Sequence, residues 1–157
     1  MNIPEAIAQH VLEVHEGNNW TEVDVVHTLQ DVTLAEAVTR TLASPNTIAS
    51  LVCHLTFWNR VMARRAQGLP TEIGPDNGFA GPELRTEADW AALRADNLRS
   101  AHELARAIRG VDASQLEAPI LPEYGSVYKN LQGAVEHIHY HLGQLVVLKN
   151  LVRSLNE

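Results

Sequence analysis

The feature that most constrains the fold is a long stretch of helical periodicity near the C-terminal end of the sequence. From Ser126 to about Leu155, apolar residues recur at the three- and four-residue spacing that places them on one stripe of a helix. The stripe contains Leu131, Ala134, Val135, Ile138, Leu142, Leu145, Val152 and Leu155. Because a helix buries such a stripe against neighbouring elements, the rest of the chain decides the architecture.

Three further helices are indicated by periodicity together with start and stop residues. One runs from Ile3 to about Glu16, the next from Ser44-Pro45 to about Gln67, and the third from Thr86 to Gly110. Ser44-Pro45 is a strong start signal, because a hydroxyl cap precedes a proline at a position where its missing N–H costs nothing. Thr86-Glu87-Ala88-Asp89 is close to a capping box, and glycine is typical of a helix end.

The connections between these helices differ in length and character. Residues 68–85 contain four glycines and three prolines without periodicity, which predicts a long surface crossing. Thr33-Leu34-Ala35-Glu36 resembles a capping box and predicts a short helix over 34–42, whereas residues 23–27 form a strand candidate too short to change the fold class. We therefore expect a single all-α domain over residues 1–157, a four-helix bundle with a long crossover connection and a short extra helix.

Composition excludes several classes of protein. With 157 residues, 45% hydrophobic and 20% charged, the chain fits one globular domain and not a disordered protein. The single cysteine, Cys53, excludes an intramolecular disulfide and a thiolate-rich zinc site. Twelve Lys and Arg against nineteen Asp and Glu give a net charge of −7, which argues against nucleic acid as a partner. No apolar run approaches the ~18–20 residues of a membrane span, so we expect no membrane partner and a cytoplasmic location.

The chemistry that the sequence suggests is that of histidine. His137 and His141 are four residues apart, so their rings project from one helix face about one turn apart and can share a metal ion. His139 lies about 200° around the same helix and is expected to be exposed or at a protein interface. His54 lies on the flank of the helix that begins at Ser44-Pro45, where it can face the pair across an end of the bundle. Three histidines leave a fourth position open for water or substrate, as in catalytic zinc sites.

The histidines also have a simpler interpretation, and other constellations are weaker. In a chain with eight histidines a pair four residues apart also arises by chance, and histidines at the border of an apolar face are frequently hydrogen-bonded without a ligand. Solvated or core-edge roles are expected for the histidines without a partner at ligand spacing, which are His10, His15, His27 and His102. Cys53 points about 100° away from its neighbour His54, so we expect a small buried hydrophobe and not a nucleophile. The nearest basic residues, Arg60, Arg64 and Arg65, are expected to form a solvated helix face.

Three segments resemble the DinB-like superfamily. Residues 135–145, which contain His137, His141 and Gln144, resemble the HxxxHxGQ pattern of that family's final helix. Residues 44–55 resemble the stretch that holds its first ligand histidine, and residues 15–20 are similar to the link after its first helix. The resemblance implies a four-helix bundle with a long crossing, often a homodimer, in which three histidines at one bundle end bind zinc or nickel. The matching ligands here are His54, His137 and His141.

The resemblance also implies functions and supporting residues. Gln144 is expected to hold a ligand ring by a hydrogen bond, and Trp20 and Trp58 are expected in the core or in the pocket beside the metal. Characterised relatives include transferases that activate low-molecular-weight thiols such as bacillithiol or mycothiol, and a thiol-dependent isomerase. The sequence thus predicts a metal-dependent enzyme with a small-molecule substrate, either a thiol-dependent S-transferase or a hydrolase. The alternatives are a non-catalytic metal-binding or stress-associated scaffold protein, and a helical dimerisation module without metal.

Overall fold

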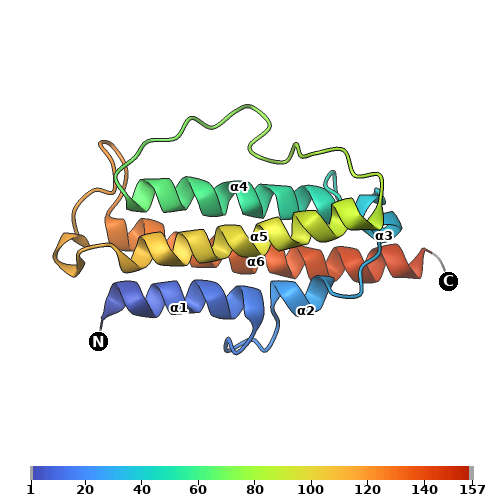
Figure 1. The fold of residues 1–157 in the computed structure, drawn as a ribbon, viewed down its shortest axis with the longest axis horizontal. Helices are drawn as coiled ribbons and strands as arrows, with labels where there is room; N and C mark the ends of the chain where they lie inside the picture. Colours follow the sequence, from blue (N-terminus) through green and yellow to red (C-terminus); the bar gives the residue numbers. More distant parts are fainter. Residues whose placement is uncertain (1, 156–157) are drawn as a thin grey trace.

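The computed structural model describes residues 2–155 and consists of helices joined by turns and one long connection (Figure 1). The elements are α1 (Ile3–Glu16), α2 (Val25–Leu29), α3 (Leu34–Val38), α4 (Ile48–Ala66), α5 (Glu87–Arg109), the 3₁₀ turn η1 (Ala113–Gln115) and α6 (Val127–Ser154). Within the described residues there is no β-strand, only two isolated bridges. The predicted all-α class is therefore confirmed, and the four long helices have nearly the predicted bounds.

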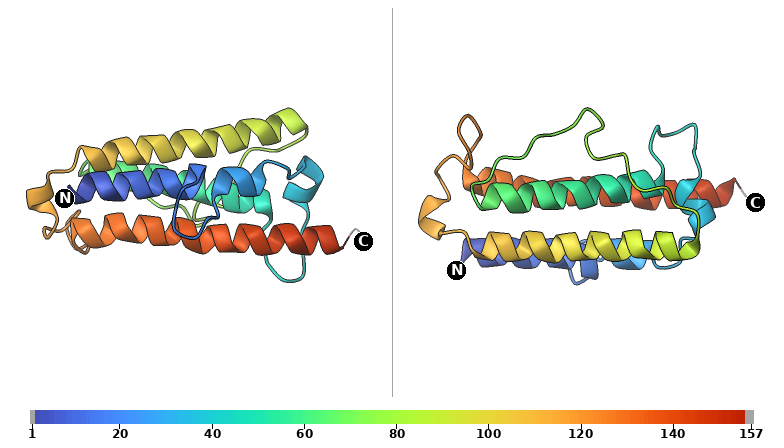
Figure 2. Two further views of the ribbon diagram at one scale, coloured as in Figure 1. Left: turned by 90° about the horizontal axis from the view of Figure 1, so that it is seen from below. Right: turned by 45° about the horizontal axis from the view of Figure 1, so that its top comes forward.

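The four long helices form a bundle in which α1 and α4 each contact both α5 and α6. The chain colours in Figures 1 and 2 show that α1 and α6 run in one direction while α4 and α5 run in the other. Because α4 and α5 are parallel, the chain must return along the whole bundle between them. Residues 67–86 make this return and pass over α4, which is the long crossing that the glycines and prolines predict.

Helix starts follow the capping residues, with one shift from expectation. Thr86 and Asp89 form the expected capping box of α5, and the Ser126 side chain accepts from the backbone N–H of Lys129, the third residue of α6. Helix α4 begins three residues later than predicted, because Thr47 and Ser50 form its capping box. Ser44 instead accepts from the backbone N–H of Asn46 and closes a turn before the helix.

The two short helices correct the prediction for the N-terminal half. The strand candidate, residues 23–27, instead contains the start of α2, because the Asp24 carboxylate accepts from the backbone N–H of His27 and caps a helix there. Figures 1 and 2 show α2 continuing the line of α1. Helix α3 ends at Val38, before the predicted 42, since Thr39 has an extended backbone. The buried side chains of Val25 and Leu29 are the reason for a helix here, because they pack into the core.

The core runs along the axis of the bundle. Val11, Leu55, Leu104 and Leu145, one from each long helix, are all 0% exposed. Burying such a side chain contributes roughly 1.5–3 kcal/mol, so the many buried apolar side chains of the core stabilise the fold together. Among residues 2–155, no helix combines the length and the hydrophobicity that crossing a membrane requires.

One polar cluster lies inside this core and joins α1, α4 and α5. This closed polar network consists of His15, Thr56, Asn59, Asn97 and Ser100, all of them buried. The His15 Nδ1–H donates to a carbonyl one turn back (2.8 Å), and its Nε2 accepts from Asn59 at 3.4 Å. Asn59 also donates to Ser100 (3.0 Å), Asn97 donates to Thr56 (3.1 Å), and both hydroxyls donate to backbone carbonyls. Each of these donors therefore has an acceptor within the protein.

Candidate metal centre

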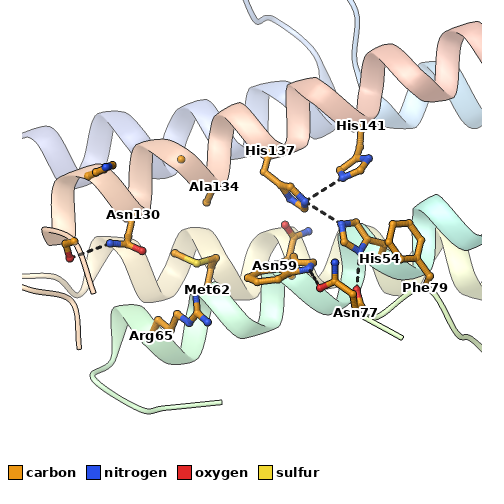
Figure 3. Close-up of a pocket in the computed structure, with 14 residues that line it drawn as sticks. His54, Asn59, Met62, Arg65, Asn77, Phe79, Asn130, Ala134, His137 and His141 are labelled. Atoms are coloured by element: carbon orange, nitrogen blue, oxygen red, sulfur yellow. Dashed lines mark hydrogen bonds between the residues drawn. The ribbon is translucent and has the colours of Figure 1, made fainter. Parts of the chain in front are cut away.

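Two neighbouring helices bring the three predicted ligand histidines together. His54 lies in the second turn of α4, and His137 and His141 lie one turn apart in the middle of α6. Figure 3 shows the three rings converging between the helices. The Nε2 atom of His137 lies 3.0 Å from Nε2 of His54 and 3.1 Å from Nε2 of His141. These residues are called the three-histidine cluster below.

The hydrogen bonds at the outer nitrogens determine where the protons of the cluster lie. The His54 Nδ1–H donates to the backbone carbonyl of Asn77 at 2.7 Å, and the His141 Nδ1–H donates to Oε1 of Gln144 at 2.7 Å. A neutral imidazole carries only one N–H. In both rings Nε2 therefore has no proton, and its lone pair faces Nε2 of His137. At most one proton is then available among three Nε2 atoms, of which the one on His137 contacts the other two. The cluster has an excess of acceptors, which a cation at its centre would satisfy.

The spacing of the cluster fits a divalent transition metal. A tetrahedral ion about 2.0–2.1 Å from each imidazole separates its ligand nitrogens by about 3.4 Å. The contacts of 3.0 and 3.1 Å are close to that value, and one ligand atom from each of the three residues lies within 4.8 Å of the others. Imidazole is a suitable ligand for zinc, nickel, copper and iron.

The electrostatics of the site favour neutral rings, the form that binds metal. Burial, with a smaller contribution from the neighbouring rings of His141 and His54, lowers the pKa of His137 to about 4. Burial likewise lowers the pKa of His54 and of His141. All three rings are therefore neutral imidazoles, and not imidazolium cations, at neutral pH.

The long crossing supplies residues that sequence reasoning missed. Besides its carbonyl contact with His54, Asn77 accepts from the indole N–H of Trp58 at 3.1 Å. The ring of Phe79 stacks on His54, with centroids 4.0 Å apart and an angle of 10° between the planes. The crossing thus fixes both the tautomer and the orientation of the His54 ring. Phe79 is the one aromatic residue of the predicted crossing, residues 68–85. This was the only feature of the sequence that could have indicated a contact between the crossing and the site.

Two glycines allow the crossing to lie directly on α4. Gly78 has a φ of +77°, and a Cβ there would collide with the ring of Phe57. A Cβ at Gly81 would collide with Sγ of Cys53. Cys53 is half-buried against this backbone and does not line the pocket of the three-histidine cluster, and burial raises its thiol pKa. This agrees with its expected role as a small packed side chain.

A pocket of about 600 Å³ begins at the three-histidine cluster and extends between α4 and α6. It is lined by His54, Trp58, Asn59, Met62, Arg65, Asn77, Phe79, Gly125, Lys129, Asn130, Gly133, Ala134, His137 and His141. The cluster therefore opens to the side of the bundle, between its helices, and not at the bundle end where we expected it. The reason is that α6 extends well past the cluster in both directions.

The two tryptophans expected near the site have different places. Trp58 lines the pocket, whereas Trp20 is 95% exposed and lies outside it. The prediction of Trp20 as a core or pocket residue is wrong. The buried side chain of Asn19 donates to the carbonyls of Glu13 and Val23 and thereby turns the next residue outward.

Two further predictions about histidine need correction. His139 is half-buried against α1, where its Nε2 lies 3.4 Å from Nε2 of His10, so neither ring stands alone. His15 belongs to the closed polar network in the core and not to its edge. His27 and His102 lie near the surface, beside the carboxylates of Asp24 and Glu16.

The three arginines of α4 do not share a solvated face. Arg60 forms ion pairs with Asp96 (2.8 Å) and Glu103 (3.1 Å) on α5, and only Arg64 is exposed as predicted. Arg65 is 7% exposed and lines the pocket. The expectation for Arg65 is wrong because it follows His54 by eleven residues, about three helical turns. Arg65 therefore lies on nearly the same face of α4 as His54, the face that borders the pocket.

Comparison with known proteins identifies the family of the chain. No curated protein matches the chain. A family model described as the DinB superfamily matches residues 19–145, which is most of the sequence and includes all three histidines of the cluster. The matched region spans α2 to the middle of α6, so it also includes the long crossing that orients His54. The chain belongs to the DinB superfamily.

Proposed function

We propose that the protein is a metal-dependent enzyme that transfers a thiol sulfur to an electrophilic small molecule. The observation that carries this proposal is that Nε2 of His137 contacts Nε2 of both His54 and His141, and that these three atoms share at most one proton beside an open pocket. His54, His137 and His141 would hold zinc, nickel or a similar divalent ion. Such an ion lowers the pKa of a coordinated thiol or water molecule, so that a nucleophile is available near neutral pH.

The protein's own side chains orient the ligands and shape the space beside them. Asn77 and Gln144 hold the rings of His54 and His141 with Nε2 directed inward. Trp58, Met62 and Phe79 form an apolar wall that excludes water from a bound substrate. A pocket of about 600 Å³ lies within the range of small-molecule sites, typically ~300–1,000 Å³.

The pocket favours thiol transfer over hydrolysis. Hydrolysis by an activated water molecule usually relies on a carboxylate as general base, and the residues that line the pocket include no Asp or Glu. In S-transfer the thiol proton leaves to solvent and the sulfur forms a bond to an electrophilic carbon. The bond from that carbon to its leaving group breaks, and the leaving group takes the electron pair. No carboxylate is needed for this sequence.

The first test is the metal content of protein purified without an affinity tag. We expect about one divalent transition-metal ion per chain by elemental analysis, and loss of that ion in His141→Ala. His139→Ala is the matched control, because it removes a histidine two residues away that contacts α1 instead. Absence of metal after incubation with zinc or nickel would overturn the proposal. It would support the alternative of a helical dimerisation module without metal.

The second test separates an enzyme from a metal-binding scaffold. Low-molecular-weight thiols are screened with a chromogenic aryl chloride, and we expect turnover that disappears in His141→Ala. Turnover unchanged in that variant would contradict the metal mechanism. Metal binding without turnover for any thiol would favour the scaffold alternative.

The third test uses two glycines of α6 with open space around them. A Cβ at Gly133 or at Gly143 meets no atom within 4 Å, but only Gly133 lines the pocket. We expect Gly133→Leu to block thiol turnover while metal content stays unchanged, and Gly143→Leu to preserve both. Equal activity of the two variants would mean that the substrate binds elsewhere.

Association into a homodimer also stays a prediction, for which analytical ultracentrifugation of the wild-type protein is the measurement.

A further inference from the structure

Arg65 occupies an unusual place for an arginine. It is 7% exposed, and it is the only buried lysine or arginine among residues 2–155. It lies in the last turn of α4, and Figure 3 shows its side chain at the opposite end of the pocket from the three-histidine cluster. A buried cation normally has a carboxylate partner, because removing a charge from water is expensive.

No such partner is present in the described part of the chain. Within residues 2–155 Arg65 forms no ion pair, and its Nε is buried without a hydrogen-bond acceptor. One terminal nitrogen donates weakly to the hydroxyl of Tyr124 at 3.5 Å. The guanidinium therefore retains unused donors in a wall of the pocket.

The contacts that Arg65 does make stabilise its charge without using those donors. Its guanidinium lies 5.4 Å from the ring centroid of Trp58 and 4.7 Å from that of Tyr124. The C-terminal end of α4 also favours a cation nearby. These contacts stabilise the guanidinium in its place beside the pocket, but they offer no acceptor to Nε.

The other charged side chain in the pocket lining is also a cation. Lys129 also lines the pocket and forms no ion pair within the described residues, and the lining contains no Asp or Glu. The whole chain has seven more acidic than basic residues, so this cationic wall contrasts with the remainder of the protein. Asn130, beside these cations, completes a polar end opposite the metal site.

We propose that this end of the pocket binds an anionic group of the small molecule, a carboxylate or phosphate, through Arg65 with Lys129 at its edge. The planar guanidinium presents paired N–H groups that match the oxygens of such anions. The proposal rests on the proposed function in one respect, because it takes the three-histidine cluster as the place where the other end of the molecule binds.

The helix geometry also sets the length of that molecule. His54 and Arg65 are eleven residues apart on α4, which corresponds to a rise of about 16 Å on nearly the same face. Helix side chains lean toward the N-terminus, so the Arg65 guanidinium reaches back toward the cluster. Between the two ends lie Trp58, Met62 and Ala134, which are apolar. The expected ligand is elongated, with a metal-binding thiol, an apolar middle and an anionic end.

The test compares thiols that differ only at the far end. Protein substituted with cobalt is titrated with ω-mercaptooctanoate and with ω-mercaptooctanol, and binding is followed by the sulfur-to-cobalt absorption band. We expect the carboxylate to bind about tenfold or more tightly than the alcohol in the wild type. This preference should disappear in Arg65→Met and persist in Arg64→Met, the exposed neighbour. Arg65→Gln serves as a second variant, which keeps a polar side chain but removes the charge.

A metal-free arm separates the anion site from the metal site. Octanoate and octyl phosphate are titrated into metal-free protein by calorimetry, and we expect binding that Arg65→Met weakens about tenfold or more. If the cobalt band forms but the carboxylate and the alcohol bind equally, the anion site is refuted and the metal site stands. If no band forms while octanoate binding still depends on Arg65, the anion site stands and the proposed thiol chemistry fails.

Discussion

The closed polar network and the three-histidine cluster both place histidine rings inside the same bundle, and they differ in how the ring nitrogens are paired. In the network, His15 donates to a backbone carbonyl and accepts from Asn59, so both ring nitrogens have partners. In the cluster, three Nε2 atoms face one another with one proton at most. The two groups meet at Asn59, which also lines the pocket. Burial alone therefore does not mark a ligand site, whereas surplus acceptors beside an open space do.

The largest expected effect comes from removing one ring of each group. His137→Ala should reduce metal content from about one ion per chain to almost none, with little change in the stability of the metal-free protein. His15→Ala should leave metal content unchanged and lower the free energy of unfolding by about 2–4 kcal/mol, because it leaves a cavity and an unpaired Asn59 donor. Elemental analysis and urea unfolding of both variants measure the difference. If His15→Ala also lost the metal, the two groups would not be independent.

The next effect is the pH dependence that the closed network imposes. Burial lowers the pKa of His15 to about 4, whereas in the unfolded chain it is near 6.5. Between these values the unfolded state binds the proton and the folded state does not, so stability rises with pH and falls on acidification. We expect His15 to account for a loss of about 3 kcal/mol between pH 7 and pH 4.

The measurement is urea unfolding of metal-free protein at several pH values, for the wild type and for His15→Leu. The difference between their pH profiles isolates the contribution of His15 from that of the cluster, whose rings titrate in the same direction. Parallel profiles would show that His15 is accessible to protons in the folded state.

A smaller effect is expected from the hydrogen bond that orients His141. Gln144→Ala should weaken metal binding about 10- to 100-fold, because the His141 ring loses the acceptor that keeps its proton on Nδ1. Gln144→Glu should restore most of the affinity, since a carboxylate accepts the same bond. Gln132→Ala, on the same helix but outside the pocket of the cluster, is the control. Competition with a chromophoric chelator gives the affinities, and equal values for all variants would refute this role of Gln144.

The sequence predicted the bundle and the meeting of three histidines better than the pocket around them. Periodicity and caps indicate the four long helices because these signals are local, and the His137–His141 spacing follows directly from helical geometry. The short α2 gave no comparable signal, since its five residues cover little more than one helical turn and the pattern has no room to repeat. The role of the Asn77 carbonyl could not be predicted from the sequence. Every residue has a backbone carbonyl, and only the fold brings this one to His54.

What the sequence determined by itself was therefore the helical class, the long crossing and the position of three histidines on helix faces. These depend on spacing of about 3.6 residues per turn and on the backbone preferences of glycine, proline and capping residues, which act over a few residues. The tertiary structure decided that Trp20 is outside, that Arg65 is inside, and that the crossing lies on His54. Those outcomes depend on which surfaces meet across the bundle, and contacts between residues far apart in the chain leave no local pattern.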